Sequence, residues 1–270
     1  MRQLRWMKYA VAVAAMALTS LAAVAELPIK PPKHAGVYVI AHRGAHEGIP
    51  ENTLAAYQKA IDLGCDFVEI DVRTTKDGKF ISMHNDSIES YVPGQKGKVK
   101  DLTFDAIRAL DIGARMGDQW KGTKVPTFEE ILDLCKGKIG IYLDLKSAPV
   151  PELVKVVKAK GMEHDIIWYV GGKQVDDLRA SCPECVPMPD PGPEMNLAKL
   201  ISDKKPQLIA STWEYCKKSF VDTCHAAGIA VIVDEDGTEC WKDLLAWGTD
   251  GIQTDHPEAL IKYLEALPKK

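Results

Sequence analysis

Short apolar segments alternate with amphipathic stretches along most of the chain, a pattern that predicts repeated strand–helix units. Apolar segments of strand length lie at residues 37–41, 67–72, 139–145, 166–170, 186–188, 208–211, 229–233 and 251–254. Helical patterns lie between them and after the last, the clearest at residues 52–63, 127–136, 150–160 and 257–267. Such units pair their strands in parallel, so the sequence predicts an α/β fold, a TIM (β/α)8 barrel. A doubly wound open sheet is the alternative arrangement.

One segment does not follow this alternation. Residues 86–124 are polar, contain Pro93-Gly94, and hold a single short helical stretch at residues 104–110. We expect a small insertion after the second strand, within one barrel domain at residues 26–270. That length is close to the roughly 250 residues typical of the barrel.

The first 25 residues have the composition of an export signal. Three basic residues precede an uncharged run rich in Ala, Val and Leu, which ends in Ala23-Val24-Ala25. A charged start, an apolar run and a small-x-small end are typical of a cleaved signal peptide. A membrane anchor is the alternative, but the run is shorter than the roughly 20 residues needed to span a bilayer. We expect a bacterial periplasmic or secreted product, without stable membrane insertion after cleavage.

Charge and cysteine content narrow the function classes. With 34 Lys and Arg against 38 Asp and Glu, the net charge is −4, so a nucleic-acid partner is not expected.

All seven cysteines follow residue 25, and export permits disulfides. Cys182 and Cys185 suit a short bridge, half a zinc site or two thiols, and no second pair completes a zinc site. We expect bridges with one thiol left over.

Charged residues occupy two of the predicted strands in pairs. Glu69 and Asp71 are two residues apart, as are Asp144 and Lys146. Side chains two apart on a strand point to the same side, and barrel enzymes keep their chemistry at the carboxyl ends of strands. Three carboxylates meeting there form an all-oxygen site for one divalent cation, Mg²⁺ or Ca²⁺. A structural ion-pair network with Lys146 and Arg43 is the alternative.

Two histidines flank these carboxylates in the sequence. His42 follows the first predicted strand and precedes Arg43, and His84 follows the second strand region. Histidine titrates near neutral pH, so one can accept a proton while the other donates one. Arg43 can hold a phosphate group through two parallel hydrogen bonds.

Several short motifs together resemble the glycerophosphodiester phosphodiesterase family in order and spacing. The matching segments are Ala41-His-Arg-Gly44, Pro50-Glu-Asn-Thr53, Phe67-Val-Glu-Ile-Asp-Val72, Thr75-Lys-Asp-Gly78, Met83-His84, Lys98–Thr103, Val125–Glu130, Asp144-Leu-Lys146, His225-Ala-Ala-Gly228 and Asp250–Asp255. The resemblance covers nearly all of residues 26–270, and its first half is the more specific.

The resemblance implies a TIM barrel that hydrolyses glycerol phosphodiesters with one divalent cation. The matched positions are metal ligands at Glu69, Asp71 and Asp144, an acid–base pair at His42 and His84, phosphate binders at Arg43 and Lys146, and Glu51 facing the metal site. The chain departs from the family pattern at several positions, where Asp144 replaces a longer Glu, Asn85 replaces an Asp, Ser90 replaces an Arg, and Asp234 replaces part of an aromatic segment that lines the alcohol site.

The expected reaction is metal-dependent hydrolysis of a glycerophosphodiester to an alcohol and sn-glycerol 3-phosphate, within lipid and glycerol metabolism. Two alternatives stay open. A related barrel enzyme would act on intact phospholipids, as phospholipase D-like or sphingomyelinase D-like proteins do, and would need an apolar rim, for which Trp120, Trp168 and Trp213 are candidates. A non-catalytic protein would bind glycerophosphodiesters without turnover. The sequence does not decide which alcohol or which metal is used, or which histidine is the acid and which the base. It also does not decide the oligomeric state.

Overall fold

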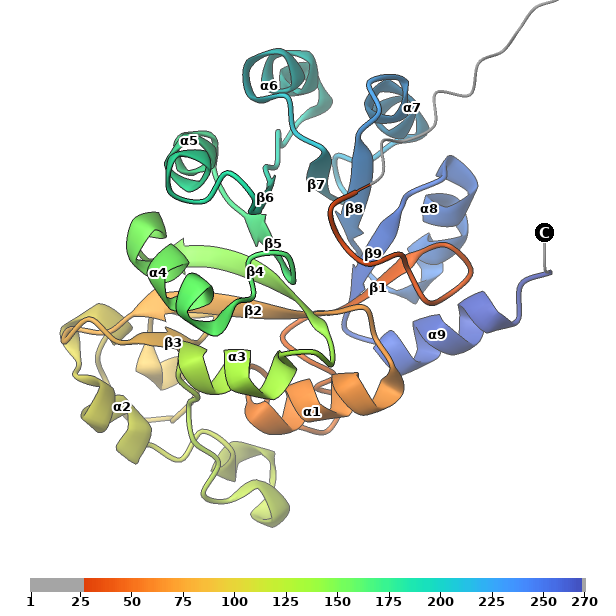
Figure 1. Cartoon of the computed structure of the whole chain (residues 1–270). Helices are drawn as coiled ribbons and strands as arrows, with labels where there is room; N and C mark the ends of the chain where they lie inside the picture. The colour runs from red at the N-terminus through yellow and green to blue at the C-terminus, as the bar shows by residue number, and fades with distance from the viewer. Residues whose placement is uncertain (1–26, 269–270) are drawn as a thin grey trace, which may run out of the picture.

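The computed structural model describes residues 27–268, so the predicted signal peptide at residues 1–25 lies outside the described part. Eight parallel strands form a nearly closed barrel with helices around it (Figure 1). The strands are β1 (Tyr38–Ala41), β2 (Phe67–Thr74), β4 (Gly140–Ser147), β5 (Ile166–Tyr169), β6 (Val186–Met188), β7 (Leu208–Thr212), β8 (Ala230–Asp234) and β9 (Gly251–Thr254). The predicted TIM barrel is therefore confirmed.

Helices connect successive barrel strands and pack around the barrel. They are α1 (Leu54–Leu63), α3 (Phe128–Cys135), α4 (Val150–Lys160), α5 (Gly172–Ser181), α6 (Leu197–Lys204), α7 (Lys218–Ala226), α8 (Trp241–Trp247) and α9 (Pro257–Glu265). Local sequence signals set their ends: Thr53 caps α1, and Thr127 and Glu130 form the predicted capping box of α3. Within residues 27–268, no helix has the length and apolarity required to cross a membrane.

The barrel closes through a sheet whose strand order is β6-β5-β4-β2-β1-β9-β8-β7. The first and last strands of that order, β6 and β7, meet through a hydrogen bond from the Ala210 amide to the Pro189 carbonyl, at 3.1 Å. Strands β4 and β2, third and fourth in this order, pair along nearly their full lengths. The seam between β6 and β7 is therefore separated from the most extensively paired strands by β5 on one side and by β8, β9 and β1 on the other.

Residue alternation along the strands creates two apolar layers. Inward-facing side chains such as Ile40, Tyr142 and Ile232 fill the barrel interior. The alternate residues, such as Val39 and Val231, pack outward against the helices. This period of two determines which polar side chains reach the mouth of the barrel.

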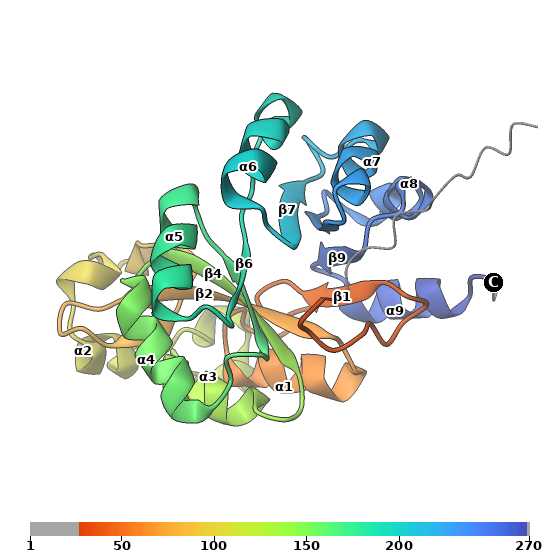
Figure 2. The ribbon, with the colours of Figure 1, turned by 45° about the horizontal axis from the view of Figure 1, so that its top comes forward.

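The insertion forms a small lobe of its own at one side of the barrel, beside β3 and away from α6–α8 (Figures 1 and 2). Strand β3 (Phe80–Ser82) pairs antiparallel with β2 and was not predicted. Then follow 3-10 turns at Ile88–Ser90, Val99–Asp101, Ala114–Met116 and Asp118–Trp120, with α2 (Phe104–Ala109) between the second and third. A separate apolar cluster that includes Ile88, Val99 and Ile107 holds the lobe together.

The predicted number of disulfide bonds was wrong. Cys182 and Cys185 form one disulfide, and the other five cysteines are reduced. These five are buried between the barrel and its helices, where they pack as small apolar side chains. Export permits disulfides but does not bring buried thiols within bonding distance.

Candidate active site

Three carboxylates gather at the carboxyl ends of β2 and β4. Glu69 and Asp71 point to the same side of β2, and Asp71 lies in register with Asp144 of β4. One oxygen of each lies within 4.8 Å of one oxygen of the others. Burial, together with the charges of Asp71 and Asp144, raises the pKa of Glu69 well above its ordinary value. Such a cluster favours a positive charge between its members.

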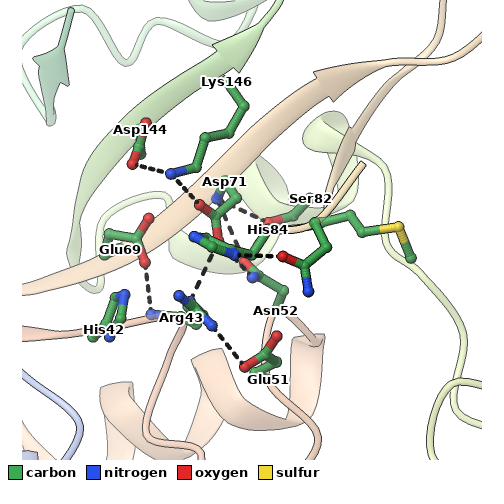
Figure 3. A network of polar contacts seen from close by, with 12 residues as sticks. His42, Arg43, Glu51, Asn52, Glu69, Asp71, Ser82, His84, Asp144 and Lys146 are labelled. Carbon is green, nitrogen blue, oxygen red and sulfur yellow. Dashed lines mark hydrogen bonds and ion pairs between the residues drawn. The ribbon is translucent and has the colours of Figure 1, made fainter. Parts of the chain in front are cut away.

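Lys146 supplies part of that positive charge. Its ammonium nitrogen lies 2.6 Å from Asp144 Oδ2 and 3.3 Å from Asp71 Oδ1 (Figure 3). Asp71 is 1 % exposed, and its Oδ1 makes no hydrogen bond within the described residues. A buried carboxylate oxygen without a hydrogen bond, beside two more carboxylates, fits an oxygen-ligated divalent cation. The donor set therefore suits the predicted metal site.

A strained turn after β1 places Arg43 beside the carboxylates. Arg43 has a left-handed backbone, with φ of 52°, and its amide donates to Glu69 Oε2 at 2.7 Å. Its guanidinium lies 3.1 Å from Glu51 Oε2 and 3.8 Å from Asp71 Oδ2. A non-glycine residue with positive φ persists only where its surroundings enforce it, and such residues cluster at functional sites. Here the turn orients both the amide and the guanidinium of one residue toward the cluster.

Gly44 follows Arg43 and makes this turn possible. Its φ is +85°, and a Cβ atom there would lie 2.7 Å from Ala56 Cβ on α1. Only glycine combines this backbone conformation with such a close approach to the helix. Gly44 therefore allows the turn that carries Arg43 to pass close to α1.

A buried hydrogen-bond network fixes the position of the Asp71 carboxylate. Asn52 Nδ2 donates to Asp71 Oδ2 at 2.7 Å, while Asn52 Oδ1 accepts from Tyr57 Oη at 2.9 Å and from Ser82 Oγ at 2.6 Å. Asn52 also has a left-handed backbone, with φ of 55°. Sequence reasoning quoted Asn52 as part of a motif but gave it no role. Its position beside Pro50 and Glu51 was the available signal.

His84 stands on the insertion side of the cluster. Its Nδ1 lies 3.2 Å from the side-chain oxygen of Asn85, and Arg73 donates to its carbonyl. Burial lowers the pKa of His84, and the charges of Arg43 and Lys146 lower it further, although Asp71 opposes them. These effects favour a neutral imidazole, the form that accepts a proton.

His42 stands on the other side and has a partner that sequence reasoning did not identify. Its Nδ1 lies 2.7 Å from Asp255 Oδ1, and His46 Nε2 lies 3.0 Å from the same oxygen. The hydrogen bonds from His42 and His46 hold the pKa of Asp255 far below its ordinary value. In the sequence, Asp255 stands out only as the end of the motif Asp250–Asp255, without a role. Its contact with His42 depends on pairing of β1 with β9.

The structure brings together seven of the eight predicted site residues around one point at the barrel mouth (Figure 3). They are His42, Arg43, Glu69, Asp71, His84, Asp144 and Lys146. Glu51 lies at the edge, where it pairs with Arg43 and is not one of the clustered carboxylates. The arrangement offers cation ligands, two basic side chains and two histidines, which suit hydrolysis of an anionic ester.

Comparisons with known proteins agree with this geometry. Residues 42–179 match the model of the glycerophosphoryl diester phosphodiesterase family. A glycerophosphodiester phosphodiesterase of Caldanaerobacter subterraneus subsp. tengcongensis is 30% identical over 241 residues, which cover 83% of this chain and 96% of the relative.

Solved structures share the fold. A phosphodiesterase from Oleispira antarctica, in complex with the product sn-glycerol-3-phosphate, has a TM-score of 0.75 and 22% identity. The match covers 85% of this chain and 97% of that one. A glycerophosphodiester phosphodiesterase from Agrobacterium tumefaciens has a TM-score of 0.73 and 24% identity, with coverage of 84% and 99%.

Proposed function

The chain belongs to the glycerophosphoryl diester phosphodiesterase family, and from this premise we propose that it hydrolyses glycerophosphodiesters with the help of one divalent cation. The products are an alcohol and sn-glycerol 3-phosphate. The observation that carries the proposal is the convergence of Glu69, Asp71 and Asp144, with the buried Asp71 Oδ1 lacking a hydrogen bond. These three carboxylates are the proposed ligands of the cation.

Phosphate binding requires local positive charge, because the chain as a whole has a net charge of −4. Arg43 and Lys146 supply it from opposite sides of the carboxylates, and each has an ion-pair partner among them. When bound, a divalent cation supplies Lewis acidity toward the phosphoryl oxygens. Arg43 and Lys146 hold those oxygens in place and stabilise the charge that develops on them.

The two histidines move the protons. Neutral His84 takes the proton of the nucleophile, either water or the adjacent glycerol hydroxyl, as the new phosphorus–oxygen bond forms. His42 gives a proton to the alcohol oxygen as the phosphorus–oxygen bond to that alcohol breaks. When the glycerol hydroxyl attacks, a water molecule subsequently opens the cyclic phosphate. We assign the base to His84 because its environment disfavours the imidazolium form.

Asp255 orients His42 for this task. Its carboxylate accepts a hydrogen bond from Nδ1 and leaves Nε2 free to face the leaving oxygen. Asp255 is thus a positioning residue, whereas His42 exchanges a proton with the substrate.

The proposed setting is export from a bacterial cell, where deacylated phospholipids are a source of glycerophosphodiesters. This part of the proposal depends on the composition of residues 1–25. Localisation of the full-length chain in cell fractions, with and without residues 1–25, tests it.

The tryptophans named for an apolar rim give little support to action on intact phospholipids. Trp168 is fully buried, and Trp213 stacks on Trp247 with ring centroids 5.2 Å apart. Trp120 donates its indole N–H to the Gly48 carbonyl at 2.7 Å. Each of the three rings thus has a packing or hydrogen-bonding partner within the protein and does not form an exposed apolar rim.

Purified protein incubated with glycerophosphodiesters, with and without EDTA, tests the reaction and its metal dependence. We expect turnover that EDTA abolishes and added Mg²⁺ or Ca²⁺ restores. Unchanged activity in EDTA, or in the Glu69→Gln, Asp71→Asn double variant, would refute the cation mechanism. Binding without turnover under every cation would favour the non-catalytic alternative, and faster turnover of phosphatidylcholine vesicles would favour the phospholipase alternative.

A further inference from the structure

Two polar side chains face the barrel interior on the side away from the carboxylate cluster, and the proposed chemistry uses neither. They are Asp234 at the end of β8 and Gln253 on β9, which lie in register with each other. Their inward direction follows from their neighbours two residues earlier. Ile232 belongs to the interior cluster, and a Cβ on Gly251 would contact the side chains of Ile232 and Tyr38 inside the barrel.

Gln253 has a buried hydrogen-bond acceptor without a partner. The side-chain amide of Gln253 lies beside the Asp234 carboxylate, its neighbour in register on β8, and lowers the pKa of that carboxyl. A carboxylate can only accept hydrogen bonds, which fits Gln253 Nε2 facing Asp234. The remaining atom, Oε1, has no hydrogen bond within the described residues, although Gln253 is only 5% exposed. A buried acceptor of this kind requires a donor.

Asp234 also lacks an opposite charge in direct contact. Among residues 27–268 its carboxylate takes part in no ion pair within 4.0 Å. Burial raises the pKa of Asp234, while the more distant charges of His42 and Arg43 lower it in part. A cation bound against Asp234 would reduce this cost of burial.

Strand β9 brings Gln253, and with it Asp234, close to the end of the strand that leads to His42. Strand β9 pairs directly with β1, which ends at His42, and neighbouring strands lie about 4.8 Å apart. The pKa of the interior residue Tyr142 is raised by burial and by the charges of both Asp144 and Asp234. Tyr142 thus lies close to the charges of both Asp144 in the cluster and Asp234.

We infer that Asp234 and Gln253 bind a protonated primary amine on the alcohol half of the substrate, as in glycerophosphoethanolamine. Two acceptors, one of them anionic, match a group with several N–H donors and a positive charge. A quaternary ammonium has no N–H to donate, and a hydroxyl has no charge. This inference rests on the proposed phosphodiesterase function and names the substrate class within it.

Steady-state kinetics with three substrates test the inference: glycerophosphoethanolamine, its N-acetyl derivative and glycerophosphocholine. We expect the wild-type kcat/KM for the free amine to exceed that for the N-acetyl derivative about 10–100-fold, the value of a charge-assisted hydrogen bond. Asp234→Asn should bring the kcat/KM values for the free amine and the N-acetyl derivative close together. It should do so mainly by raising KM for the amine, because the amine lies away from the reacting bonds. The N-acetyl substrate should react at a similar rate in both proteins.

Asp190→Asn is the matched control. Asp190 lies in the loop after β6, where Oδ2 accepts from Tyr169 Oη at 3.0 Å and Oδ1 from the Gly192 amide at 2.6 Å. Its carboxylate is thus fully occupied within the protein. The substitution removes the same charge from the same end of the barrel and should leave the substrate ratio unchanged.

Several outcomes would overturn the inference. These are a wild-type protein that turns over the three substrates equally, an unchanged ratio in Asp234→Asn, and the same fall in ratio in Asp190→Asn. If Asp234→Asn does not fold, Gln253→Met gives the same readout, with loss of the ratio expected. Absence of turnover with all three substrates would instead refute the proposed function, so the two failures are distinguishable.

Discussion

His42 Nδ1 and Asp255 Oδ1 lie 2.7 Å apart although 213 residues separate them in the chain. The pairing of β1 with β9 brings them together, since Ala41 and Thr254, the residues just before them, are in register. One side of the proposed acid–base pair thus depends on closure of the barrel by its last strand. The same carboxylate oxygen also contacts His46, which gives it two imidazole partners.

Replacement of Asp255 by Asn should lower kcat more than it changes KM. Asparagine can donate as well as accept, so it no longer enforces one tautomer of His42. Loss of the orienting carboxylate of a catalytic histidine costs up to about 10⁴-fold in kcat. Single-turnover kinetics and a pH–rate profile measure the effect, because the profile should shift as well as fall.

His46→Asn is the control for this prediction. It removes the second imidazole partner of Asp255 and leaves the contact with His42 in place. An equal loss of kcat in both variants would show that the contacts among His42, His46 and Asp255 have only a structural role.

Stability without metal should fall as the pH rises. Burial raises the pKa of Glu69, so the folded chain binds this proton more tightly than the unfolded chain does. The resulting stabilisation is complete below about pH 4.3, the ordinary glutamate pKa, and is lost as the pH rises through the folded-state pKa. In EDTA, Tm measured by calorimetry should therefore decrease over a pH range that starts near this ordinary value and extends upward.

Glu69→Gln should reduce this slope, because it removes the titrating group. Added Mg²⁺ or Ca²⁺ should raise Tm of the wild-type protein at the upper end of the range and have little effect on the variant. A wild-type slope of the opposite sign, or an equal response of both proteins to the cation, would contradict the role of the cluster.

Gly44→Ala should destabilise the protein and impair the site. The added methyl would lie 2.7 Å from Ala56 Cβ on a backbone with φ of +85°, which we expect to cost about 2–4 kcal/mol in unfolding free energy. Urea denaturation measures this cost. Gly48→Ala is the control, because Gly48 has φ of +73° but no atom within 4 Å of the added methyl. It should cost only about 1–2 kcal/mol.

The thiols should be unreactive until the protein unfolds. Burial raises the pKa of Cys65, Cys135, Cys216 and Cys224 to about 12, which suppresses the reactive thiolate. Titration with a thiol reagent should detect five thiols in guanidinium chloride without reductant and all seven after reduction. A single thiol under the first condition would support the pairing expected from the sequence instead.

The period of two along apolar strands predicts both the barrel and the cluster. It places Glu69 with Asp71 and Asp144 with Lys146 on inward faces, and the barrel rule sends both pairs to the same end. These predictions need only local pattern and the parallel order of the strands.

Contacts that depend on closure of the barrel or on a particular turn could not be predicted from the sequence pattern. The roles of Asn52 and Asp255 depend on a left-handed turn and on the β1–β9 pairing. Strand β3 is short, and its pairing with β2 is set by a tight turn that the apolar pattern does not mark. The error in the number of disulfides has the same origin, because the burial of unpaired thiols depends on tertiary packing.

The seam between β6 and β7 has a consequence for how the barrel fluctuates. Its hydrogen bond from Ala210 to Pro189 is much weaker than the continuous ladder of β2 with β4. Local opening follows the path with the fewest interactions to break, so the ring loosens first along this seam. Thermal opening of the barrel is thereby directed away from the β2–β4 ladder that holds the carboxylates.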